Sequence, residues 1–190
     1  MKSIKLHAPA TTANVGPGYD IFAMAHHEPY DEITISLTES KDIKIEVCGD
    51  KQNIPVNIMD NTAGLAILEL FKRKNIQQGV LFQLYKNMPS GGGLGTTGAS
   101  AAAAIVGLNK LLDLSLSDNE MVDIARYGEV ASGGSPHADN VAAAILGGFV
   151  LVKNYHPIDV VKLDLPEIHI VLAAIRKSQR TTRGFITYEI

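Results

Sequence analysis

A glycine-rich segment near the middle of the chain has the sequence Pro89-Ser90-Gly91-Gly92-Gly93-Leu94-Gly95-Thr96-Thr97-Gly98-Ala99-Ser100. Residues 80–86 before it predict a strand, and the Ala-rich residues 96–112 predict a helix. Glycine permits a close approach of the backbone to a ligand, and the first N–H groups of a helix have no intrahelical partner. With the helix dipole, these donors form a site for phosphates. Thr96 or Thr97 would cap the helix or bind a phosphate-bound Mg²⁺.

Two common phosphate-binding motifs differ from this segment. The ATPase loop ends in Gly-Lys-Ser/Thr, whereas Gly95 is followed directly by Thr96. The dinucleotide-binding motif needs an acidic residue about twenty positions further on. The nearest acid, Asp113, lies where the predicted helix ends. A tight turn that only lets a helix pack closely against a sheet remains the purely structural alternative.

A second segment, residues 9–20, has the sequence Pro-Ala-Thr-Thr-Ala-Asn-Val-Gly-Pro-Gly-Tyr-Asp and follows the first predicted strand. Its small and turn-forming residues indicate a constrained loop. Asn14 and Asp20 would direct polar groups from this loop toward a substrate. A plain turn, in which these side chains bond to their own backbone, is the alternative.

A third segment runs from Glu129 through a Gly/Ser loop to His137, Asp139 and Asn140. It predicts a helix end, a turn and a new helix whose start is another candidate anion site. Glu129 would supply the protein carboxylate that Mg²⁺ takes in addition to phosphate oxygens. Alternatively, Glu129 is a solvated helix residue and Asp139 only complements a helix dipole. The spacing gives no third ligand for zinc, and no Gly-x-Ser-x-Gly segment indicates a hydrolase.

The remaining patterns predict an α+β fold, because strands and helices do not alternate as regular βαβ units. Residues 32–37 and 42–47 alternate with period two around a short polar turn, which predicts an antiparallel hairpin. Further predictions are helices over 61–75, 117–131 and 137–146 and strands over 148–152 and 168–175.

Composition limits the class of protein. The chain has 190 residues, 46% hydrophobic and 19% charged, with a net charge of −3, which is typical of a globular protein. This charge excludes a basic surface for nucleic acid, and no apolar run is long enough for a membrane span. The single Cys48 cannot form an internal disulfide. We therefore expect a cytoplasmic protein with no nucleic-acid or membrane partner.

Taken together and in this order, the three segments resemble motifs of the GHMP kinase superfamily. Residues 89–100 are similar to its P-x-x-x-G-L-G-S/T-S/T-x-A-S phosphate loop, with threonines where serines are commoner. Residues 9–20 are similar to the P-A-T-S/T-A-N-x-G-x-G-F/Y-D motif of the homoserine kinase family within it. The stretch from His137 to Ala142, followed by Gly147 and Gly148, resembles that family's H-x-D-N-V-A…G-G motif.

The resemblance implies a fold and a division into domains. It implies an N-terminal domain like domain 2 of ribosomal protein S5 over residues 1–153 and the start of a second domain over 154–190. The family's ferredoxin-like C-terminal domain would be missing or barely begun. A chain without that domain would expose apolar surface, which predicts poor solubility or a homodimer.

The resemblance also implies a reaction, namely ATP-dependent phosphorylation of the L-homoserine hydroxyl in threonine biosynthesis. Thr97 and Glu129 would hold Mg²⁺, and Asp139 occupies a position like that of an aspartate in mevalonate kinases. The substrate would contact Asn14, Asp20, His137, Asn140 and, through its carboxylate, Arg183. The triphosphate would lie against Pro89, Ser90, Gly91, Gly92, Gly93, Leu94, Gly95, Thr96, Thr97, Gly98 and Ala99.

Two alternatives stay open at this point. One is a kinase of the same superfamily that acts on another small alcohol, such as mevalonate or shikimate. The other is a nucleotide-binding fragment without catalytic activity. The missing C-terminal half motivates the second alternative. The Ser178–Arg183 stretch resembles the family's S-T-K-x-A-R pattern but has Gln179 in place of threonine, which bears on the role given to Arg183.

Overall fold

The computed structural model describes residues 2–49, 53–166 and 168–172. The strands are β1 (Ser3–Ala13), β2 (Phe22–Thr38), β3 (Ile43–Cys48), β4 (Gly79–Tyr85), β5 (Phe149–Tyr155) and β6 (Ile158–Leu163). The helices are α1 (Thr62–Lys74), α2 (Thr96–Leu111), α3 (Asp118–Ala125), α4 (Val130–Gly133) and α5 (Asp139–Leu146), with 3₁₀ turns η1 (Ile58–Asp60) and η2 (Arg126–Glu129).

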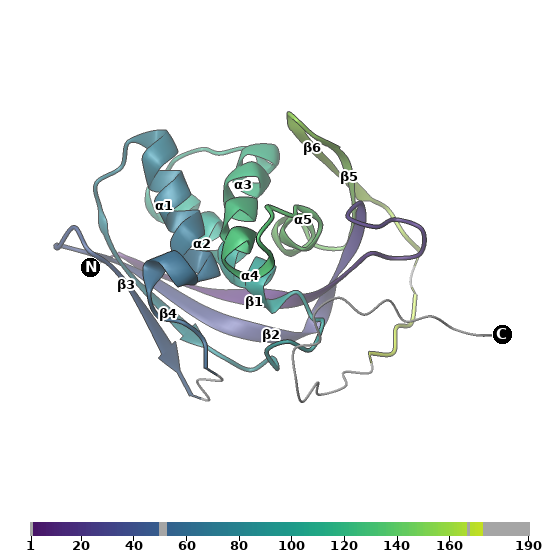
Figure 1. Ribbon diagram of the computed structural model, residues 1–190, viewed down its shortest axis with the longest axis horizontal. Helices are drawn as coiled ribbons and strands as arrows, with labels where there is room; N and C mark the ends of the chain where they lie inside the picture. Colours follow the sequence, from purple (N-terminus) through teal and green to yellow (C-terminus); the bar gives the residue numbers. More distant parts are fainter. Residues whose placement is uncertain (1, 50–52, 167, 173–190) are drawn as a thin grey trace.

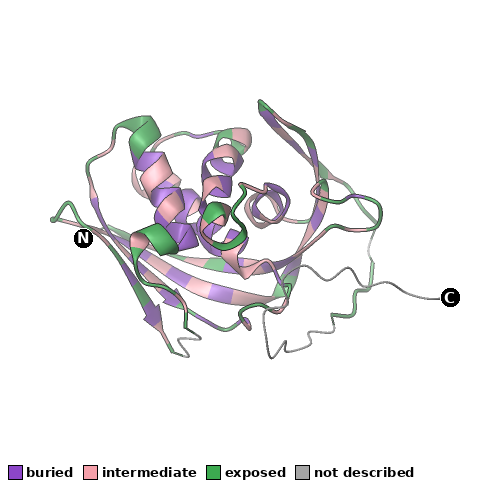
Figure 2. Cartoon of the chain, in the orientation of Figure 1, coloured by how far each residue is buried: buried purple, intermediate pink, exposed green. Residues whose placement is uncertain are grey.

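The described elements form two layers, a sheet and a set of helices on one of its faces (Figure 1). Strand order is β3-β4-β2-β5-β6, and β1 pairs antiparallel with β2. The buried residues lie between the two layers (Figure 2). This arrangement confirms the expected α+β class. None of the helices in the described part of the chain has the length and the apolar run that crossing a bilayer requires.

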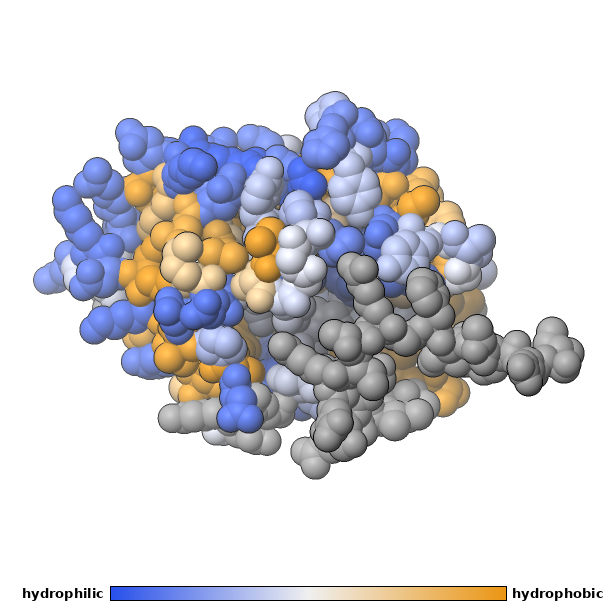
Figure 3. Space-filling view, viewed as in Figure 1, coloured by the Kyte–Doolittle hydropathy of each residue, from blue (hydrophilic) through white to orange (hydrophobic). Residues whose placement is uncertain are grey.

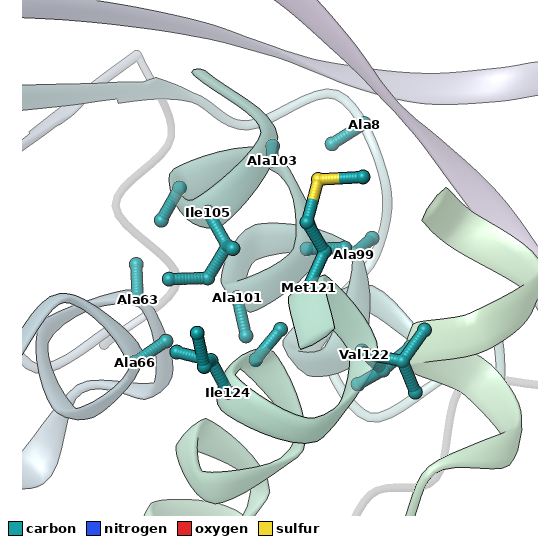
Figure 4. Close-up of a cluster of buried hydrophobic side chains, with 14 of the residues drawn as sticks. Ala8, Ala63, Ala66, Ala99, Ala101, Ala103, Ile105, Met121, Val122 and Ile124 are labelled. Carbon is teal, nitrogen blue, oxygen red and sulfur yellow. The ribbon is translucent and has the colours of Figure 1, made fainter. Parts of the chain in front are cut away.

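Helix α2 lies at the centre of the helical layer and is buried along most of its length. Its alanines let neighbouring helices pack at short range, so Ala99 and Ala101 share one cluster with Ala63 of α1 and Ile124 of α3 (Figure 4). On the outside, hydrophilic residues cover the top of the helical layer (Figure 3). The close packing fixes the N-terminus of α2 against the neighbouring segments.

The predicted hairpin of residues 32–37 and 42–47 is wrong. Strand β4 lies between β2 and β3, antiparallel to β2 and parallel to β3. Buried Val80, Phe82 and Leu84 make β4 suited to an interior position, whereas Lys44 and Glu46 of β3 are exposed and suit an edge. The short turn after β2 therefore leads to β3, which is separated from β2 in the sheet by β4.

Two further predictions need correction. The helix expected over 117–131 divides into α3, η2 and α4, because Gly128 packs directly on α1, where a Cβ atom would lie 2.3 Å from the Thr62 carbonyl oxygen. Residues 168–172 of the expected last strand form no strand and are exposed, since no described strand pairs with them. Residues 173–175 lie outside the described residues.

The sheet continues past residue 153, because β5 extends to Tyr155 and β6 pairs with it. Most residues of the proposed second unit, 154–190, either belong to this hairpin or lie outside the described part of the chain. The division into domains at residue 153 stays a prediction.

Candidate active site

The glycine-rich loop connects β4 to α2. Gly91, Gly93 and Gly95 all have positive φ, at 73°, 75° and 60°, so the loop changes direction at alternate residues. Gly95 is the N-cap of α2 and offers no side chain to its first turn. The N–H group of Ala99 is bonded to the Gly95 carbonyl oxygen at 2.9 Å, whereas the three N–H groups before it precede the intrahelical ladder. These three donors give the start of α2 the partial positive charge that an anion requires.

The three segments singled out in the sequence meet at this helix start. The Thr11 hydroxyl, from β1, donates a 2.7 Å hydrogen bond to Oδ1 of Asn140, at the start of α5. The Thr11 N–H donates to the Leu94 carbonyl oxygen at 3.0 Å. A Cβ on Gly95 would lie 1.8 Å from the Thr11 hydroxyl oxygen, so glycine is required here for space as well as for φ.

The loop between β1 and β2 carries Asn14 and Asp20, both left-handed, with φ of 59° and 55°. Oδ1 of Asn14 accepts a hydrogen bond from the Asp20 N–H at 2.8 Å, which closes the loop on itself. Tyr155 of β5 donates its hydroxyl to the Asp20 carbonyl oxygen at 2.8 Å. The Asp20 carboxylate stands 3.5 Å from Nδ1 of His137, so the first and third segments also meet here.

Asp139 begins α5 and is only 2% exposed. Its Oδ1 accepts a hydrogen bond from the Asn140 N–H at 2.8 Å. Burial raises the pKa of the Asp139 carboxyl, and the negative charge of Asp20 raises it further. The Asp139 carboxyl therefore stays protonated up to a higher pH than an ordinary aspartate does.

Glu129 reaches the same region from η2. Its Oε1 atom is buried and has no hydrogen-bond partner among the described residues. Burial raises the pKa of the Glu129 carboxyl, and the negative charge of Asp139 raises it further. The Thr97 side chain lies close enough to Glu129 to lower this pKa in part. A buried carboxylate oxygen without a partner is costly, which indicates a site built for a cation or a donor from outside the chain.

A pocket of about 350 Å³ opens beside the loop. Its lining includes Ser90, Gly91, Thr96 and Thr97 of the loop and first turn, together with Asn61, Thr62 and Lys86. The last three residues were not predicted from the sequence. The helix-start signal at Asn61 was visible, since its Oδ1 accepts hydrogen bonds from the Ala63 and Gly64 N–H groups. Nothing in the local pattern indicated that it faces the loop.

Lys86 also forms a buried ion pair behind the loop. Its ammonium group contacts Oδ2 of Asp31, and both side chains are almost completely inaccessible. Oδ1 of Asp31 accepts hydrogen bonds from the Asn87 and Met88 N–H groups, each at 2.8 Å. The chain leaving β4 is therefore fixed immediately before Pro89, and the loop begins from a rigid point.

The structure thus brings Asn14, Asp20, His137, Asp139 and Asn140 together on one side of the α2 N-terminus, with Thr97 and Glu129 adjoining them. Arg183 lies outside the described residues. Within the described residues, no three His, Cys, Asp or Glu side chains form a metal cage. The chemistry available is anion binding at a helix start next to carboxylates.

Comparisons with known proteins agree on a family. Residues 61–148 match the GHMP kinases N terminal domain. The whole chain is 41% identical to a homoserine kinase of Methanococcus vannielii and spans 64% of that protein. It is 40% identical, over 92% of the chain, to a homoserine kinase of Sulfurisphaera tokodaii, of which it spans 58%. The chain therefore spans roughly three fifths of the curated relatives that it matches.

Solved structures give the same result. A homoserine kinase from Cytophaga hutchinsonii superimposes on 87% of the chain, with a TM-score of 0.80 and 41% identity, and the match covers 53% of that structure. A mevalonate kinase of Methanococcus jannaschii, at 18% identity and a TM-score of 0.64, shares the fold.

Proposed function

We propose that this chain carries the N-terminal domain of the GHMP kinases and is the ATP-binding part of a homoserine kinase, an enzyme of threonine biosynthesis. The observation that carries the proposal is the uncapped start of α2 behind a loop with three left-handed glycines. The proposed reaction joins the acceptor hydroxyl oxygen to the γ-phosphorus of ATP and breaks the bond from that phosphorus to the bridging oxygen. The products are ADP, O-phosphohomoserine and the hydroxyl proton.

The nucleotide would lie across the loop. Backbone N–H groups at the start of α2 would bind the phosphates, and the adjoining pocket is large enough for part of a nucleoside. Phosphoryl transfer depends mainly on positioning and on neutralising charge, and rigid backbone donors supply both. The Lys86–Asp31 pair supports this role because it fixes the backbone just before the loop.

Mg²⁺ fits the donor set next to the loop. The partnerless Oε1 of Glu129 is a hard oxygen ligand, and the Thr97 hydroxyl lies nearby at the start of α2. Mg²⁺ takes one or two protein carboxylates and completes its coordination with phosphate oxygens and water, so a protein cage is not required. When bound, the ion would neutralise the charge of the phosphates, while Glu129 and Thr97 would hold it against the loop.

The amino-acid acceptor would lie between the first and third segments. Asp20 is a natural partner for the substrate ammonium group, while Asn14, His137 and Asn140 surround it with polar groups. Arg183 remains our proposed contact for the substrate carboxylate. Asp139 lies beside Asn140 with a raised pKa, which suits a catalytic position next to the acceptor hydroxyl.

Binding and turnover test the proposal separately. Calorimetric titration with a non-hydrolysable ATP analogue and Mg²⁺ should give saturable 1:1 binding, and its absence would remove the nucleotide site. A coupled assay of ADP production should show turnover with L-homoserine. Turnover with mevalonate or shikimate and none with homoserine would overturn the choice of substrate, and binding without any turnover would favour the fragment without activity.

Replacing Thr97 tests the Mg²⁺ site. Thr97→Ala removes a hydroxyl ligand, so we expect the Mg²⁺ concentration at half-maximal binding of the ATP analogue to rise about tenfold, the cost of one good ligand contact. Thr97→Ser keeps the hydroxyl and is the matched control. An unchanged Mg²⁺ dependence in Thr97→Ala would exclude Thr97 from the site.

A further inference from the structure

The side chain of Thr11 is completely buried on β1, and its hydroxyl contacts a residue of the proposed acceptor site. We propose that Thr11 is a positioning residue that fixes the side-chain amide of Asn140, so that the Asn140 amino group faces the reacting phosphate and the acceptor hydroxyl. This inference rests on the proposed kinase function and adds a residue to it.

The hydrogen bond determines which way the amide is turned. The Thr11 hydroxyl donates to Oδ1 of Asn140 at 2.7 Å. With the amide reversed, the hydroxyl would have to accept from Nδ2, and its own proton would need another acceptor. Asn140 Oδ1 is the acceptor that this buried hydroxyl uses in the described structure, so the reversed amide would take that acceptor away from a buried donor.

Thr11 is held in place through its backbone as well as through its side chain. Its N–H group donates to the Leu94 carbonyl oxygen of the phosphate loop at 3.0 Å. Directly above the Thr11–Asn140 pair lies Gly95, whose missing Cβ would fall 1.8 Å from the threonine oxygen and 2.6 Å from Oδ1 of Asn140. The pair therefore fills the space beneath the N-cap of α2.

The consequence concerns Nδ2 of Asn140. Since Oδ1 is used by Thr11, and Nδ2 has no hydrogen-bond partner among the described residues, both Nδ2 protons are available to a ligand. The Asn140 side chain packs against the first turn of α2, where a Cβ on Gly98 would lie 3.2 Å from its Cβ. A fixed donor at this place would stabilise charge that develops on the transferred group or on the acceptor oxygen.

Steady-state kinetics with L-homoserine test the inference. Thr11→Ala and Thr11→Val both remove the hydroxyl, and we expect kcat to fall about tenfold to a hundredfold while KM for ATP changes less than about threefold. Thr11→Ser keeps the hydroxyl and should restore most of kcat. In an Asn140→Ala background, removal of the Thr11 hydroxyl should have no further effect, because the residue acts through Asn140.

The side-chain amide resonances of Asn140, measured by NMR with the ATP analogue bound, give a second readout that does not need turnover. Thr11→Ala should shift these resonances, and Thr11→Ser should not. Unshifted resonances, or kinetic losses that simply multiply in the double variant, would overturn the inference and leave the kinase proposal intact. A parent protein that turns over no alcohol would instead refute the proposed function, and the resonances would still decide the role of Thr11.

Discussion

At the scale of single residues, the buried carboxyl of Glu129 in the candidate site lowers the free energy of unfolding of the ligand-free protein. In the native state its carboxyl is buried, its Oε1 has no partner among the described residues, and its pKa is raised. Between the usual pKa of a glutamate and the raised value, the native state binds more protons than the unfolded state. Stability therefore falls as pH rises through this window, and the full loss is present above it.

Glu129→Gln should accordingly stabilise the ligand-free protein at neutral pH. We expect a gain of about 1 kcal/mol, or about 2–4 °C in Tm, because the variant has no charge to bury. The gain should shrink as pH is lowered toward the usual glutamate pKa. Thermal unfolding over a range of pH measures it, and a variant less stable than the parent at neutral pH would show that Glu129 is not strained. Binding of Mg²⁺ with the ATP analogue should weaken in the same variant.

Gly95 provides a second test at this scale. Gly95→Ala places a Cβ 1.8 Å from the Thr11 oxygen and forces an L-residue to φ of 60°. Gly93→Ala has the same backbone problem, with φ of 75°, but nothing lies within 4 Å of the added atom. We expect the affinity for the ATP analogue to fall at least about tenfold more in Gly95→Ala than in Gly93→Ala, since only the former adds a collision to the backbone cost of about 1–2 kcal/mol. Equal losses in titration calorimetry would mean that the contact with Thr11 has no bearing on the loop.

At the scale of elements, strand β5 supports the loop between β1 and β2 that carries Asn14 and Asp20. Tyr155 donates to the Asp20 carbonyl oxygen at 2.8 Å, so Tyr155→Phe removes a tie across 135 residues of sequence. One hydrogen bond contributes about 1 kcal/mol, which predicts about a fivefold rise in KM for the amino acid and no change in affinity for the ATP analogue. Tyr127→Phe is the matched control. The Tyr127 ring packs under Arg73, and its hydroxyl has no hydrogen-bond partner among the described residues. A rise in KM for both variants would contradict a specific role for Tyr155.

The same scale shows what the sequence could predict and what it could not. The bounds of α1 and α2 followed from local patterns, namely the helical spacing of apolar residues after residue 61 and a glycine-rich start. The pairing of β3 did not follow from local patterns. The order of strands depends on which strand pairs along both of its edges, and long-range packing gives β4 that position. The break at Gly128 is likewise set by contact with Thr62, far away in sequence.

The candidate site divides in the same way. Asn14, Asp20, His137 and Asn140 stand in recognisable motifs, and the structure places them together. Thr11 was part of a quoted motif, but its partner was not predictable, since the hydrogen bond to Asn140 joins residues 129 positions apart. Lys86 and Asp31 gave no local signal, because a buried ion pair looks in sequence like two ordinary surface charges.

At the scale of the whole molecule, the described residues after β6 leave apolar side chains in water. Ile168 is 49% exposed and Val171 is 94% exposed, and Leu165, Ile170 and Leu172 lie close by in sequence with substantial exposure of their own. The helical layer packs on the sheet and does not cover these residues (Figure 1). Apolar surface of this kind favours association with another surface.

We therefore expect the 190-residue chain to self-associate through the exposed apolar side chains of Leu165, Ile168, Ile170, Val171 and Leu172. Burial of a large aliphatic side chain contributes about 1.5–3 kcal/mol, so the double variant Ile168→Glu/Val171→Glu should weaken association at least about tenfold. Light scattering after size-exclusion chromatography, over a range of protein concentrations, measures this. Met59→Glu is the control, because Met59 is 63% exposed but lies elsewhere, in η1. If the control weakens association as much as the double variant does, added charge alone explains the effect. If neither weakens it, the apolar side chains after β6 are not the contact. Only a contact made by these side chains responds to charge placed among them and not to charge placed on η1.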